Sequence, residues 1–126
     1  MIAPIQNGSP ADPRPPGEQA AAAFLPGGAL AAATGDFEYE ARPQQVDMAR
    51  AVAEALAAGR PLIVEAGTGV GKSLAYLVPL ILHAKRNGVR ALVSTHTISL
   101  QEQLVGKDLP LLERHLGASF RAALVK

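Results

Sequence analysis

Two long segments of the chain carry hydrophobic residues at helical spacing. In the first, Val46, Ala49 and Leu56 fall on one face, charged residues occupy other positions, and Gly59 follows the last turn. Apolar residues at this spacing are typical of an amphipathic helix, and glycine commonly follows the last turn of one. The pattern therefore predicts an amphipathic helix over residues 43–58.

The second helical pattern covers residues 72–86 and includes Pro79. A proline inside a helix removes one backbone hydrogen bond, so we expect a kink there. Asn87 and Gly88 follow as a stop signal. This segment is therefore predicted to be a second long helix.

Shorter apolar runs alternate with these helices. Residues 62–64, 89–94 and 120–125 are rich in Leu, Ile, Val and Ala and are predicted to be strands, while short helices are predicted after residue 97 and over residues 110–116. The order is helix, strand, helix, strand, helix, strand. Such an order predicts an α/β fold, with a parallel sheet whose strands are joined by right-handed crossovers and flanked by helices.

The first 35 residues have a different composition. They hold six of the ten prolines and five of the twelve glycines, and few large apolar side chains. A segment of this kind buries too little apolar surface to offset the entropy lost on ordering. We therefore expect a disordered tail over residues 1–35 and a folded part over residues 36–126.

Charge is unevenly divided between these two parts. Residues 1–40 carry a net charge of −4 and residues 41–126 a net charge of +5, which suits a polyanionic partner but is weak evidence by itself. The chain has no cysteine, which excludes a disulfide framework and a thiolate metal site within it. No apolar stretch is long enough to span a bilayer and no secretory signal is visible, so we expect a cytoplasmic protein without a membrane partner.

A glycine-rich stretch follows the first predicted strand. Gly67, Gly69 and Gly71 precede Lys72 and Ser73, and a helical pattern comes next. Strand, glycine-rich loop and helix in this order are typical of a phosphate-binding P-loop, in which backbone N–H groups surround anionic oxygens. If the stretch is a P-loop, Lys72 reaches the β- and γ-phosphates of ATP and the Ser73 hydroxyl binds Mg²⁺. The alternative is a glycine-rich turn that binds nothing.

Two other polar segments are candidate sites. Arg42 and Gln45 precede the glycine-rich loop, and a Gln amide can match the edge of adenine, although a solvated helix start explains the same residues. Residues 94–97 follow the second predicted strand, at the sheet edge where α/β proteins bind ligands. There the alternative is turn chemistry, with either Thr97 or Ser99 as the cap of the next helix.

Three motifs together carry a family resemblance. They are F-E-Y-E-A-R-P-Q-Q at 37–45, E-A-G-T-G-V-G-K-S-L-A-Y-L-V-P at 65–79 and S-T-H-T-I-S-L-Q-E-Q-L-V-G-K-D-L-P at 94–110. In this order they resemble the Q motif, motif I and motif Ia of superfamily 2 DNA helicases of the DinG/XPD type. Ala66 departs from the strict P-loop pattern, which has Gly there, but this family commonly begins motif I with A-G-T-G.

The resemblance implies a RecA-like ATP-binding domain with ATP and Mg²⁺ as cofactors. The residues that it implies for the nucleotide are Arg42, Gln45, Ala66, Gly67, Thr68, Gly69, Val70, Gly71, Lys72, Ser73 and Leu74, and those for nucleic acid are Thr95, His96 and Thr97. It also implies ATP-driven movement on single-stranded or forked DNA. Many family members carry an iron–sulfur cluster, for which this chain has no ligands.

The chain holds only part of what such a helicase needs. It has no Asp-Glu-x-His box and no second motor domain. We therefore expect it to correspond to the N-terminal part of a longer enzyme and to be inactive alone. The rival interpretation is a stand-alone P-loop module that binds nucleotide and regulates a partner. The sequence does not indicate the oligomeric state.

Overall fold

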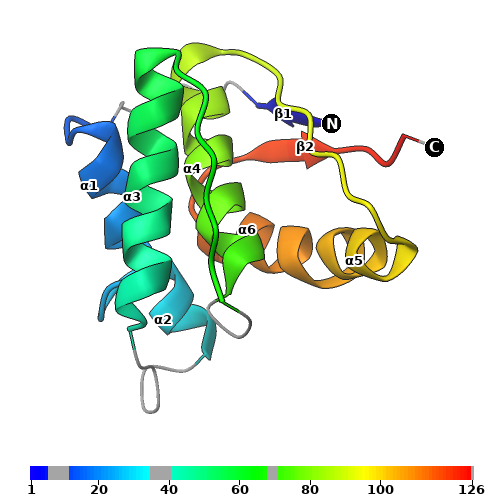
Figure 1. Cartoon of the computed structure of the whole chain (residues 1–126), viewed down its shortest axis with the longest axis horizontal. Helices are drawn as coiled ribbons and strands as arrows, with labels where there is room; N and C mark the ends of the chain where they lie inside the picture. The colour runs from blue at the N-terminus through cyan, green and yellow to red at the C-terminus, as the bar shows by residue number, and fades with distance from the viewer. Residues whose placement is uncertain (6–11, 35–40, 68–70, 126) are drawn as a thin grey trace.

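The computed structural model describes residues 1–5, 12–34, 41–67 and 71–125 (Figure 1). Its elements are β1 (Ile2–Pro4), α1 (Pro16–Ala22), α2 (Ala29–Thr34), α3 (Pro43–Ala58), α4 (Lys72–Asn87), α5 (Ile98–Gln103), the π-helical turn η1 (Leu104–Asp108), α6 (Leu109–His115) and β2 (Phe120–Ala122). In Figure 1, α3 and α4 run side by side, α1 lies against α3, and the two short strands lie on the other side of α4.

Helix α4 is the centre of the core. The largest fully buried side chains are Phe24, Leu77, Val78, Pro79, Ile81 and Leu112, and four of these six belong to α4. This helix contacts α1, α3, β1 and η1. Burying a large apolar side chain contributes about 1.5–3 kcal/mol, so packing around α4 supplies much of the stability of the fold.

The two long helices confirm the predictions made from their hydrophobic pattern. α3 begins at Pro43 and ends before Gly59, whose φ of 64° is left-handed. α4 ends before Gly88, with a φ of 63°. Glycine adopts this conformation without the steric cost that a Cβ imposes, which explains why both helices end where the sequence places a glycine.

The prediction of a disordered tail over residues 1–35 is not confirmed: residues 1–5 and 12–34 include β1, α1 and α2. Residues 6–11 and 35 of that segment lie outside the described residues. The tail was expected because large apolar side chains are scarce there. Small residues provide the packing instead, because a helix rich in Ala and Gly can approach its neighbour closely.

The contact between α1 and α3 illustrates this close approach. A Cβ added at Gly17 would lie only 3.0 Å from the Arg50 side chain of α3, and Ala20 and Ala21 are 1% and 2% exposed. Phe24, which follows α1, is completely buried. One aromatic side chain and a close helix contact therefore attach this segment to the core.

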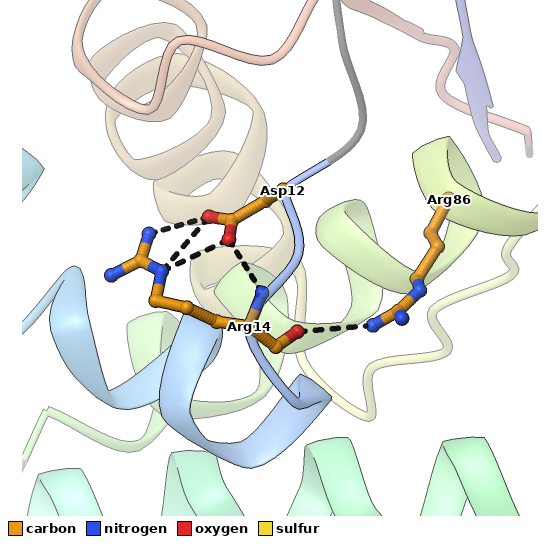
Figure 2. Close-up of polar contacts among 3 residues, drawn as sticks. All are labelled: Asp12, Arg14 and Arg86. Carbon is orange, nitrogen blue, oxygen red and sulfur yellow. Dashed lines mark hydrogen bonds and ion pairs between the residues drawn. The ribbon is translucent and has the colours of Figure 1, made fainter.

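Polar contacts hold the same segment against the end of α4. Arg14 donates to the Asp12 carboxylate from its side chain and its backbone N–H, and Arg86 of α4 donates to the Arg14 carbonyl at 3.4 Å (Figure 2). These hydrogen bonds from Arg14 lower the pKa of Asp12 from an ordinary 3.8 to about 2. Lys85 donates to the Ile5 carbonyl. The basic end of α4 is thus used to bind the N-terminal backbone.

The strands differ from the expected parallel sheet. Among the described residues the sheet consists of β1 and β2, which pair antiparallel with Ile2 opposite Ala122, and one isolated bridge joins Ile2 to Ala91. The predicted strand over residues 120–125 is confirmed for Phe120–Ala122. Ile2 exchanges backbone hydrogen bonds of 2.8 and 2.9 Å with Ala91. The 89–94 segment is therefore paired with β1, whereas the prediction was that it would pair with a parallel strand.

The first predicted strand, over residues 62–64, has no regular secondary structure. Leu62, Ile63 and Val64 are 44%, 97% and 39% exposed. A strand is stabilised by pairing along its edges, and within the described residues the sheet of β1 and β2 does not include this segment. The chain is therefore extended but unpaired where it enters the glycine-rich loop.

Candidate functional site

The end of the glycine-rich loop is held by a left-handed glycine. Gly71 has φ 75° and ψ 45° and is the N-cap of α4. Its carbonyl oxygen accepts the first helical hydrogen bond, from the Ala75 N–H at 3.2 Å. The loop therefore leads directly into a helix N-terminus, where unpaired backbone N–H groups and the helix dipole favour an anion.

Gln45 contacts this loop from the neighbouring helix. Its Nε2 donates to the Gly71 carbonyl at 3.1 Å, and its side chain, on the first turn of α3, is only 7% exposed. A Cβ added to Gly71 would lie 2.2 Å from that same nitrogen. The structure thus brings together Gln45 and the glycine-rich loop, which the sequence analysis treated as separate candidate sites.

Lys72 bridges the two ends of the loop. Its Nζ donates to the Ala66 carbonyl at 3.1 Å, and its side chain is exposed. An ammonium group on a flexible chain can exchange this carbonyl for a phosphate oxygen with little rearrangement. The loop therefore carries a positive charge at its mouth.

Ser73 lies one turn before Tyr76 on α4. Burial raises the pKa of Tyr76, a hydrogen bond with the Ser73 hydroxyl lowers it in part, and the nearby Asp108 carboxylate raises it again. Three residues of separation place two helical side chains next to each other. Ser73, the candidate Mg²⁺ ligand, therefore lies on the same face of α4 as Tyr76.

The other predicted nucleotide residues lie around these contacts. Arg42 is the N-cap of α3, one turn before Gln45, and its side chain is exposed. Ala66 is half-buried, Gly67 is exposed, and Leu74 packs against the core. Thr68, Gly69 and Val70 lie outside the described residues.

The predicted nucleic-acid segment precedes α5. Thr97, and not Ser99, is the cap of this helix, because its Oγ1 accepts from the Leu100 N–H at 3.2 Å. The Thr95 hydroxyl donates to the Thr97 carbonyl at 3.5 Å, and His96 is exposed. A capping threonine uses its oxygen as acceptor and keeps its own O–H for another partner. Capping and backbone contact to DNA are therefore compatible at Thr97.

Thr95 also borders a hollow among the described residues. This cavity of about 690 Å³ lies between the 92–95 segment, the η1 and α6 helices and the C-terminal strand. Leu92 and Val125, two of the apolar residues that line it, are 76% and 68% exposed. Its walls combine these apolar side chains with polar ones, among them Ser94, Thr95, Gln101, Glu113 and Arg121.

Sequence reasoning missed a buried acid and its hydrogen bond. Asp108 in η1 is only 6% exposed and accepts a hydrogen bond from the Gln103 side chain at 3.2 Å. These residues are five positions apart, which is the spacing of a π-helical turn, and such turns are frequent at functional sites. The sequence did not predict that Asp108 is buried, because a single acidic residue in a helix is usually exposed to solvent.

The described residues contain no cluster of three or more His, Cys, Asp or Glu side chains that could hold a metal ion. Within the same part of the chain, none of the helices is long and apolar enough to cross a membrane.

Comparison with protein families shows to which family the chain belongs. The family model described as DEAD/DEAH box helicase matches residues 46–123, which include the glycine-rich loop, α4 and the segment before α5. The chain belongs to the DEAD/DEAH box helicase family. The α/β class of the fold follows from this membership.

Individual relatives agree with this family. The chain is 56% identical over 71 residues to ATP-dependent helicase DinG of Mycobacterium tuberculosis H37Rv, which is 56% of this chain and 11% of the relative. It is 44% identical over 103 residues to ATP-dependent DNA helicase YoaA of Escherichia coli K12, covering 82% of this chain and 15% of the relative.

A third relative has a different name. The chain is 38% identical over 88 residues to 3'-5' exonuclease DinG of Bacillus subtilis 168, covering 70% of this chain and 10% of that protein. The chain thus spans about a tenth to a seventh of the length of these curated relatives. No solved structure matches it.

Proposed function

We propose that residues 36–126 form the N-terminal part of the ATP-binding domain of a DinG-type ATP-dependent DNA helicase. In this proposal the domain is RecA-like, and its sheet becomes parallel when the rest of the motor is present. The observation that carries the proposal is the loop itself: a left-handed Gly71 at the N-terminus of α4, followed by an exposed Lys72 ammonium. The family match and the DinG and YoaA relatives support it.

The donor set of this loop fits a magnesium nucleotide. The first N–H groups of α4 have no helical acceptor and point toward the loop, and Lys72 adds a mobile positive charge. Ser73 supplies a hydroxyl oxygen, a type of ligand that Mg²⁺ accepts together with phosphate oxygens. When bound, the metal neutralises charge on the β- and γ-phosphates during transfer. The residues of this chain bind and orient the phosphates.

The base and the DNA are assigned to neighbouring segments. Arg42 and Gln45 are proposed to contact the adenine, because both lie at the start of α3 and Gln45 already touches the phosphate loop. Thr95, His96 and Thr97 are proposed to contact the backbone of single-stranded DNA. Hydroxyls and backbone N–H groups beside a helix N-terminus are common phosphate ligands in DNA complexes.

Nucleotide binding by the 126-residue chain tests this function. Wild-type protein should bind MgATP, and Lys72→Ala should bind it more weakly, while Lys107→Ala, a change of another exposed lysine, should not differ from wild type. ATP hydrolysis should stay at background even with single-stranded DNA, because positioning by a P-loop alone gives little catalysis. A chain that does not bind MgATP, or that hydrolyses it well above the Lys72→Ala variant, contradicts the proposal.

DNA binding distinguishes a helicase segment from a nucleotide module. The chain should bind single-stranded DNA with an affinity that falls as salt rises, because phosphate contacts release counterions. Thr95→Val should weaken this binding and leave MgATP affinity unchanged. Nucleotide binding without any DNA binding would favour the stand-alone module.

A further inference from the structure

The contact between Gln45 and Gly71 joins two segments that are 26 residues apart in the chain. Gln45 is buried on the first turn of α3, whereas its neighbour Gln44 is exposed. A buried amide that makes a hydrogen bond across two elements fixes their relative position, because breaking it leaves a desolvated polar group. The loop end is therefore attached to α3 as well as to α4.

The atom that Gln45 contacts makes the contact important for phosphate binding. The Gly71 carbonyl and the Lys72 N–H belong to the same peptide unit, which is planar, with the two groups pointing in opposite directions. Holding the carbonyl against Gln45 therefore directs the Lys72 N–H away from α3. That N–H is among the first N–H groups of α4, which lack a helical acceptor and are free for an anion.

We propose that Gln45 is a positioning residue for the phosphate loop, and that its hold on the Gly71 carbonyl strengthens the binding of a phosphate chain whether or not a base is attached. This inference rests on the proposed nucleotide-binding function. It adds a role for Gln45 that is separate from reading adenine. The two roles are compatible, because Nε2 serves the loop and Oε1 is an acceptor for a base N–H group.

A ligand without a base separates the two roles. We would measure the affinity of the 126-residue chain for magnesium tripolyphosphate and for MgATP by isothermal titration calorimetry. The variant is Gln45→Met, which keeps the length of the side chain and loses the donor. Gln44→Met, one residue away and exposed, is the matched control. Gln45→Ala serves as a second variant, and far-UV circular dichroism checks that each protein is folded.

We expect Gln45→Met to weaken tripolyphosphate binding about threefold to tenfold, the range that one hydrogen bond supplies. Gln44→Met should bind like wild type. A residue that only reads the base would give the opposite pattern: MgATP binding would fall and tripolyphosphate binding would stay the same. That result would overturn the inference and leave the proposed function intact. A wild-type chain that binds neither ligand would overturn both.

Amide hydrogen exchange gives a readout that needs no ligand. In Gln45→Met, the peptide that contains Gly71 and Ala75 should exchange faster than in Gln44→Met, because the Gly71 carbonyl has lost one of its two donors. The middle of α4, over residues 77–84, should be unchanged. Equal exchange in both variants would show that Gln45 does not hold the loop.

Discussion

Gly71→Ala is expected to destabilise the protein by two separable effects. The first is backbone strain, because an alanine at φ 75° costs about 1–2 kcal/mol. The second is a collision, because the new Cβ would lie 2.2 Å from Gln45 Nε2. That amide must move away, which removes a hydrogen bond that contributes about 0.5–1.5 kcal/mol. The sum is a loss of about 1.5–3.5 kcal/mol.

Two other glycines separate these contributions. Gly59 also has a left-handed φ, of 64°, but a Cβ there meets nothing within 4 Å, so Gly59→Ala measures backbone strain alone. Gly106 in η1 has neither a positive φ nor a close neighbour, so Gly106→Ala should be nearly neutral. The cost of Gly71→Ala minus that of Gly59→Ala then isolates the contact with Gln45.

Urea denaturation followed by circular dichroism measures all three variants. In a Gln45→Ala background, Gly71→Ala should cost about as much as Gly59→Ala, because the collision has been removed and the strain remains. A Gly71→Ala variant that costs no more than Gly59→Ala in the wild-type background would refute the reasoning. It would mean that the loop end is not packed against Gln45 in solution.

Three further predictions test other contacts. Phe24→Ala should lower the free energy of unfolding by about 3–5 kcal/mol, because this side chain is fully buried. Leu25→Ala, at a residue that is 43% exposed, should change it little. Equal effects of the two substitutions would mean that the segment is not docked. Lys72→Ala should weaken MgATP binding at least about tenfold without changing thermal stability, as calorimetry and melting curves would show. By NMR titration the pKa of Asp12 should be about 2, and Arg14→Ala should return it toward 3.8. Because this pKa is lowered by folding, the contact stabilises the docked segment above pH 3.8 and is lost as pH falls through 2.

Local signals explain what the sequence predicted correctly. The bounds of α3 follow from Pro43 at its first turn and Gly59 after its last, and the end of α4 follows from Gly88. These features act within one or two turns, so one sequence contains all the information. Thr97 as the cap of α5 was one of two alternatives, because Ser99 has the same chemistry.

Long-range contacts explain what the sequence did not predict. Helix α1 docks through close contacts of Gly and Ala with α3, and a count of large apolar side chains does not detect such contacts. The pairing of β1 with β2 joins the two ends of the chain, and no local pattern specifies it. The predicted strand at 62–64 has the right side chains but no neighbour among the described residues.

The candidate site divides in the same way. The chemistry of Lys72 and Ser73 could be predicted from the spacing of the glycine-rich motif. Gln45 was a candidate because its amide can match the edge of adenine, and the family resemblance favoured that role. The geometry could not be read, because nothing in the sequence indicates that the Gln45 amide contacts Gly71 or that Lys72 reaches back to Ala66. The position of Tyr76 beside Ser73 was not predicted, because a tyrosine at an apolar position of a helix usually packs in the core.

The contacts of Gln45 with Gly71 and of Lys72 with Ala66 matter more because the segment before the loop is unpaired. Residues 62–64 are exposed and make no strand pairing among the described residues, so they do little to fix where the loop begins. The loop is positioned instead from its far side, by α4 and Gln45, and across its mouth by the Lys72 bond to Ala66. A phosphate chain that attracts Lys72 breaks that bond, which costs about 0.5–1.5 kcal/mol of the new contact. The effect of Lys72→Ala on phosphate affinity is therefore expected to be a net value. In the proposed complex the Gln45 contact with Gly71 would still hold the end of the loop to α3.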